Sequence, residues 1–68
     1  MKKGQIVKVY DGDLVGFVSA TLLDRVCVLE KNVLERWTMI TEHGYILTRI
    51  VRPYKINPPK DGCAYLLF

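Results

Sequence analysis

The fold is decided by one stretch of sequence, Lys3-Gly4-Gln5-Ile6-Val7-Lys8-Val9-Tyr10-Asp11-Gly12-Asp13-Leu14-Val15-Gly16-Phe17-Val18. Its first part places Val7 and Val9 on one face and their neighbours on the other, which is the period of two of a half-buried strand. Residues 11–13 favour a turn, because aspartate side chains bond local amides and glycine accepts a positive φ. A second apolar run follows, and Gly16 within it is expected to bend that strand. In a chain of 68 residues, these features predict a small β-barrel that makes up most of the protein.

The middle of the chain allows two interpretations. A turn at Asp24-Arg25 followed by a third strand over residues 26–29 fits the β-branched residues there. The alternative is an amphipathic helix over about residues 21–37, because apolar residues recur there at intervals of three or four. We favour strands. The recurring residues are Leu22, Val26, Leu29, Val33, Trp37 and Ile40.

The clearest hairpin of the sequence is centred on residues 41–44. Two β-rich runs flank Thr41-Glu42-His43-Gly44, and ordinary residues followed by glycine suit a type I turn closed by a left-handed glycine. This turn fixes the register of the flanking strands. It predicts that Met39 lies opposite Leu47, and that Trp37 lies opposite Arg49.

Composition bears on the function classes. Half of the residues are apolar and the net charge is +3, so some apolar surface is expected to meet a partner, whereas the charge is modest for a nucleic-acid binder. Cys27 and Cys63 are expected to be reduced and half-buried, and with the single His43 they do not form a zinc site. We expect no metal, no cofactor and no enzymatic activity, because no nucleophile–base pair is recognisable.

Residues 2–52 resemble two related groups of small barrels. The entry Lys3-Gly4, the valines at 7 and 9, the glycines at 12 and 16, and the run 26–28 resemble KOW-type and other SH3-like barrels. The chain also resembles short SH3-like proteins of bacteriophages. This second resemblance rests on Lys2, Gly4, Val7, Val15-Gly16-Phe17-Val18, Trp37 and Gly44. It implies an all-β, SH3-like barrel of about five antiparallel strands with an extended C-terminal segment.

Aromatic and basic residues in the second half of the chain suggest a contact surface. Trp37, Arg49, Arg52 and Lys55 could contact nucleic acid or a protein partner, because bases stack on aromatic rings beside cationic side chains. The alternative is that Trp37 is the main core side chain of the barrel and the arginines border it.

The C-terminal segment changes character after the barrel, which is expected to span residues 1–56. Residues 57–68 combine a Pro-rich spacer with an apolar terminus, Tyr65-Leu66-Leu67-Phe68. This segment is expected to be either an arm that docks on a partner or the closing strand of the barrel.

The sequence therefore predicts a non-catalytic protein–protein interaction module, with a small structural or accessory component of a larger assembly, such as a phage particle, as the expected setting. The alternative is a KOW-like nucleic-acid-binding protein. No membrane-spanning helix or secretory signal is recognisable, so a cytoplasmic or virion location is expected.

Overall fold

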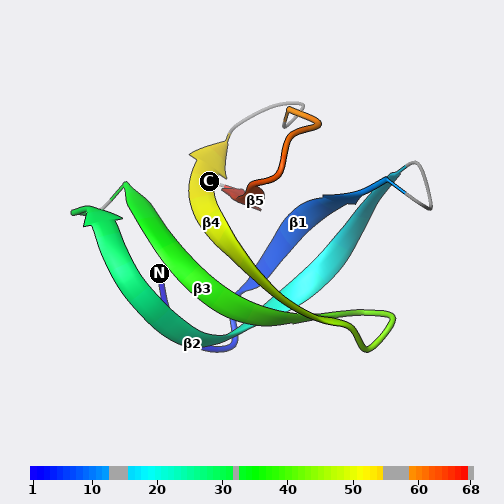
Figure 1. Ribbon diagram of the computed structural model, residues 1–68, viewed down its shortest axis with the longest axis horizontal. Helices are drawn as coiled ribbons and strands as arrows, with labels where there is room; N and C mark the ends of the chain where they lie inside the picture. The colour runs from blue at the N-terminus through cyan, green and yellow to red at the C-terminus, as the bar shows by residue number, and fades with distance from the viewer. Residues whose placement is uncertain (13–15, 32, 55–58, 68) are drawn as a thin grey trace.

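The computed structural model describes residues 1–12, 16–31, 33–54 and 59–67. It is all-β, and its five strands close into a barrel in the order β1-β2-β3-β4-β5, which confirms the predicted fold class (Figure 1). The strands are β1 (Ile6–Asp11), β2 (Gly16–Glu30), β3 (Leu34–Thr41), β4 (Ile46–Tyr54) and β5 (Ala64–Leu67).

Alternation along the strands builds the core. Val7 and Val9 of β1 are buried, whereas Ile6 before them and Lys8 between them are exposed, as predicted. Trp37 and Met39 of β3 are buried in the same way. The buried apolar cluster takes side chains from all five strands and consists of Val7, Val9, Ala20, Leu22, Trp37, Met39, Val51 and Ala64.

The β3–β4 hairpin has the predicted register. Met39 pairs with Leu47 and Trp37 with Arg49. At the turn, the Thr41 amide donates to the Tyr45 carbonyl at 2.8 Å, and Gly44 has a φ of 87°. Glycine adopts this left-handed conformation without steric cost, which explains why the local sequence was sufficient to predict the turn.

Strand β2 contradicts two expectations for the middle of the chain. No turn forms at Asp24-Arg25, and no helix forms over residues 21–37, of which all but residue 32 are described; β2 instead continues to Glu30. The pairing of β2 with β3 shifts register three times, at Leu22/Asp24, Arg25/Cys27 and Val28/Glu30. Each shift adds one residue to β2, so the strand bends without interruption.

The residues with helix-like spacing do not share one face in the structure, because Leu22 and Trp37 are buried whereas Val26, Leu29 and Val33 are exposed. Leu22 pairs with Met39, Arg25 with Trp37 and Val28 with Glu35. The residues advance by three along β2 while their partners advance by two along β3. The expected bend therefore lies at these shifts rather than at Gly16, which begins β2 opposite Asp11.

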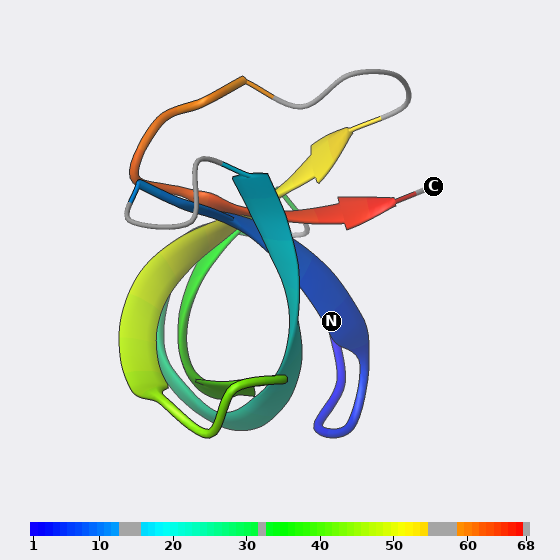
Figure 2. The same cartoon turned by 90° about the vertical axis from the view of Figure 1, so that its right-hand side faces the viewer.

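Strand β5 closes the barrel by lying between β1 and β4 (Figure 2). Its pairing with β1 is antiparallel, but its pairing with β4 is parallel, so one contact of the barrel departs from the expected antiparallel arrangement. The barrel consequently extends beyond the boundary expected at residue 56. A free arm is the wrong interpretation for residues 64–67, because all four pair with β4, and Ala64 and Tyr65 also pair with β1.

Candidate functional site

The first candidate site is the far part of the β2–β3 hairpin, residues 24–30 and 33–36, which we call the hairpin end. Here β2 pairs with β3 alone among the described strands, because its pairing with β1 stops at Thr21. Figure 1 shows the two strands continuing side by side away from β5. Every residue of β2 from Asp24 to Glu30 is exposed or half-buried.

Large apolar side chains lie on this hairpin end. Each of four such residues keeps between 39% and 55% of its surface exposed. This is unusual for several apolar residues in one place on a small domain. The bulges also disrupt the regular ladder of β2, so the hairpin end offers side chains to a partner more readily than backbone groups. The side chains concerned are Val26, Val28, Leu29 and Val33.

A second apolar area crosses the outside of the barrel. Ile6 pairs with Thr21, Thr21 with Ile40, and Ile40 with Ile46, so the four side chains form one row across β1 to β4. Ile6 and Ile46 at its ends are exposed, and the two residues between them are half-buried. This row is narrower than the hairpin end and contains a hydroxyl at its centre.

The third candidate is a cavity of about 460 Å³ at the end of the barrel next to the β3–β4 turn. Its lining combines apolar side chains with two tyrosines, one arginine, one histidine and one aspartate. Cavities of this size that combine apolar walls with a few polar groups are typical of ligand sites. The lining residues are Val9, Tyr10, Asp11, Gly12, Val18, Thr41, His43, Tyr45, Leu47 and Arg49.

Buried Thr41 holds the rim of this cavity in place. Its hydroxyl oxygen accepts hydrogen bonds from the His43 amide at 3.3 Å and the Tyr45 amide at 3.2 Å. The two residues that it fixes are themselves exposed. The turn therefore presents an imidazole and a phenol ring to solvent from a rigid backbone.

Arg49 supplies the positive charge of the cavity. It is half-buried, and its Nη1 donates to the Thr48 carbonyl at 2.9 Å. Asp11 lines the same cavity and takes part in a contact of its own. Tyr10 packs edge-to-face on Phe17 with ring centroids 5.4 Å apart, and the Lys60 ammonium lies 5.8 Å from the Tyr10 ring centroid.

The structure separates the four residues that were expected to form an aromatic and basic contact surface. Trp37 is 96% buried, so the core interpretation is correct and its ring cannot serve as an exposed stacking platform. Arg49 faces the cavity, whereas Arg52 is exposed on β4 outside the cavity lining. Lys55 lies outside the described residues.

The C-terminal residues that were expected to bind a partner also differ from one another. Tyr65 is buried, Leu66 is half-buried against the core, and only Leu67 is largely exposed. Phe68 lies outside the described residues. Tyr65 and Leu66 therefore serve the barrel itself, and a partner contact by Leu67 remains a prediction.

Asp61 fixes the start of this closing strand. The Tyr65 hydroxyl donates to the Asp61 carboxylate, with 2.6 Å to each oxygen, and the Cys63 amide donates to the same carboxylate at 2.9 Å. These bonds hold the pKa of Asp61 below its ordinary value, the Tyr65 bond contributing most. Burial, followed by the bond to Asp61, raises the pKa of Tyr65.

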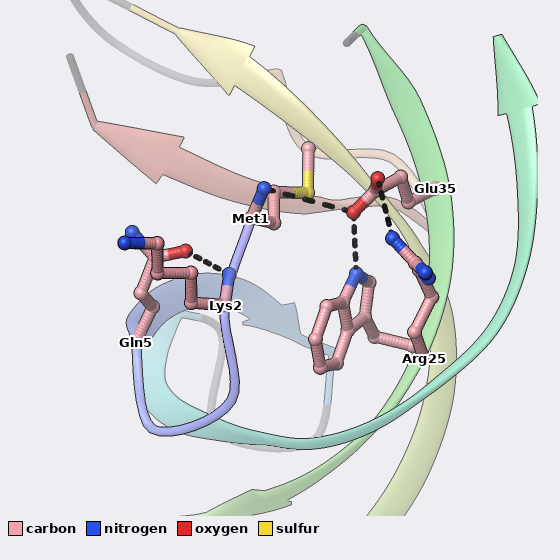
Figure 3. A network of polar contacts seen from close by, with 6 residues as sticks. Met1, Lys2, Gln5, Arg25 and Glu35 are labelled. Atoms are coloured by element: carbon pink, nitrogen blue, oxygen red, sulfur yellow. Dashed lines mark hydrogen bonds and ion pairs between the residues drawn. The ribbon is translucent and has the colours of Figure 1, made fainter. Parts of the chain in front are cut away.

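A buried carboxylate, that of Glu35, lies near the start of β3, at the end of the strand opposite Thr41 and the cavity. Glu35 Oε1 accepts a hydrogen bond from Trp37 Nε1 at 2.9 Å and lies 3.8 Å from the Met1 ammonium. Glu35 Oε2 lies 3.6 Å from Arg25 Nη1, as the close view shows (Figure 3). Each charge contacts an opposite one, which is the arrangement expected of a structural network.

The sequence did not indicate the hairpin end as a site, because its apolar residues were assigned to strands with one buried face. It did identify Arg49 as a candidate contact residue, although it grouped this arginine with Trp37. Cys27 and Cys63 are half-buried free thiols. Within the described residues, no group of three potential metal ligands occurs, and no helix is long and apolar enough to cross a membrane.

Comparisons with known proteins do not identify a family for this chain. No protein-family model, no curated protein and no solved structure matches the chain.

Proposed function

We propose that this chain is a non-catalytic protein–protein interaction module that contacts another protein through the hairpin end. The observation that carries the proposal is the exposure of Val26, Val28, Leu29 and Val33 at the end of a hairpin whose strand β2 continues past its pairing with β1. Burying such side chains against a partner contributes about 25 cal/mol per Å² of apolar surface removed from water. The barrel then serves as a rigid base that presents the hairpin.

The chemistry of the hairpin end indicates what kind of partner surface it fits. Apolar side chains at the centre of the hairpin end are bordered by Asp24, Arg25, Glu30 and Lys31, which are all exposed and of both signs. This arrangement fits an apolar protein surface with a mixed-charge rim. It does not fit a phosphate backbone, which requires a concentration of positive charge.

The biological setting of the proposal comes from the resemblance to SH3-like barrels. Five strands closed into a small barrel agree with that fold. The likeness to short SH3-like proteins of bacteriophages supports a role as a small structural or accessory component of a larger assembly, such as a phage particle.

Site-specific photo-crosslinking tests the proposal. A photo-crosslinking amino acid placed at position 29 of the hairpin end should form a covalent adduct with one defined protein in the source material. The matched control carries the same group at exposed Thr48 of β4. Adducts at neither position, or equal adducts at both, would contradict the proposal.

A further inference from the structure

The cavity at the end of the barrel is a separate feature that the hairpin end does not use. Its volume of about 460 Å³ exceeds that of one large apolar side chain, so it has room for a side chain and the adjoining backbone. Val9, Val18 and Leu47 supply its apolar wall, and Tyr10 and Tyr45 supply aromatic surface. An occupant that buries an apolar group is therefore favoured.

Arg49 adds a specific electrostatic requirement. A guanidinium has five N–H donors, and among the described residues Arg49 makes one hydrogen bond, to the Thr48 carbonyl at 2.9 Å. The ion pairs found among the described residues involve Glu35, not Arg49. Donors thus remain for a ligand, and the planar guanidinium matches a carboxylate in a two-point contact. Half-burial strengthens this contact relative to one in open solvent.

The residues around the cavity favour a ligand with one negative charge over a ligand with several successive charges. Asp11 lines the cavity and Glu42 lies beside its rim on the β3–β4 turn, so successive phosphates would meet like charges. At the cavity, Tyr10 and Asp11 of β1 pair with β2 and not with β5, and Leu47 and Arg49 of β4 lie before the pairing of β4 with β5, which begins at Val51. A chain end that enters here brings one carboxylate and one apolar side chain on the same residue, which matches Arg49 beside the apolar wall.

We infer that this cavity binds the C-terminal residue of a partner protein chain. The apolar side chain of that residue packs against Val9, Val18 and Leu47, and its terminal carboxylate pairs with Arg49. The inference rests on the proposed function in taking a protein as the occupant, but it uses a surface other than the hairpin end.

Titration of the isotope-labelled chain with short peptides, followed by NMR, tests this inference. The probes are acetyl-Gly-Gly peptides that end in valine, leucine or phenylalanine, each as the free acid and as the terminal amide. At least one free acid should shift the signals of Arg49 and Tyr45 at millimolar concentration and bind about tenfold or more tightly than its amide. If no acid shifts these signals, or if acid and amide bind equally, the inference is overturned.

Three substitutions sharpen the result. Arg49→Gln should reduce binding of the acid to that of the amide, while Arg52→Gln, on the same strand but outside the cavity lining, should leave it unchanged. Folding of each variant is checked by its amide spectrum, and Tyr45→Ala at the exposed rim provides a second variant that should weaken binding. An oligothymidylate that occupies the cavity while the peptides do not would also overturn the inference.

The hairpin end supplies the control that separates the two proposals. The double variant Val26→Ser/Leu29→Ser should bind the free-acid peptide like the wild type. If this variant loses the native partner, the proposed function stands. If, in addition, no form of the chain binds a peptide, the cavity inference is overturned.

Discussion

Trp37 and Glu35 are joined within the barrel by a hydrogen bond from the indole Nε1 to the carboxylate Oε1, 2.9 Å long, and both residues are buried. They lie two positions apart on β3 and therefore point to the same side of the strand. The carboxylate also lies near the Met1 ammonium and Arg25. A polar network thus closes the end of the core opposite the cavity.

Replacing this carboxylate should destabilise the barrel. Glu35→Ala leaves the indole N–H without its acceptor in a buried position, which costs about 1–3 kcal/mol. Glu35→Gln keeps an acceptor oxygen and should cost less. Urea unfolding followed by the fluorescence of Trp37, the single tryptophan of the chain, measures both. Equal stability of the alanine variant and the wild type would contradict the role assigned to this bond.

The Asp61–Tyr65 contact predicts a pH dependence of stability. The pKa of Asp61 in the folded chain is lowered from its ordinary value of 3.8, chiefly by the Tyr65 hydrogen bond. A lowered folded-state pKa adds stability above pH 3.8, and that stability is lost as the pH falls through the folded-state value. Asp61→Asn should therefore lose less stability than the wild type on acidification below pH 3.8.

Tyr65→Phe is the matched variant for this measurement. It removes the largest cause of the lowered pKa but retains the bond from the Cys63 amide. Its acid dependence should lie between those of the wild type and Asp61→Asn. Parallel curves of stability against pH for all three chains would show that the contact does not form in solution.

Strand β5 should be required for folding rather than for docking alone. Ala64 is fully buried between β1 and β4, so Ala64→Glu would place a charge in the core and should leave the chain largely unfolded. Leu67→Ser, on the same strand but largely exposed, should change the free energy of unfolding by less than about 0.5 kcal/mol. Circular dichroism and urea unfolding measure both. A folded Ala64→Glu chain would mean that β5 does not close the barrel.

Two glycines of the chain should respond differently to alanine. Gly44 has a φ of 87° with open space around it, so Gly44→Ala is resisted by backbone conformation alone, at a cost of about 1–2 kcal/mol. Gly12 also has open space but no left-handed φ, and Gly12→Ala should change stability by less than about 0.5 kcal/mol. Thermal unfolding of the two variants under one buffer condition compares them. Equal losses would contradict the turn geometry.

The parts of the fold that depend on local chemistry were predictable. The turn at Gly44 fixes its own register, so the opposition of Met39 and Leu47 follows from a few adjacent residues. The faces of Val7 and Val9 follow in the same way from alternation. These features need no knowledge of distant segments.

The parts that depend on distant partners were not predictable. The bulges of β2 are defined only by its pairing with β3, which no local pattern of the sequence indicates. The parallel contact of β5 with β4 depends on where the chain returns after residue 54. The position of Arg49 at a cavity follows from closure of all five strands.

The central claim is that the apolar residues of the hairpin end serve an interaction rather than the core. Comparison of the double variant Val26→Ser/Leu29→Ser with the wild type tests this most directly. The assembly is isolated from the source and its native mass is measured, and the unfolding of each purified chain is measured separately. We expect the variant to remain folded, within about 1 kcal/mol of the wild type, and to be absent from the assembly, while Thr48→Ser remains in it. A variant that unfolds, or one that assembles normally, would contradict the claim.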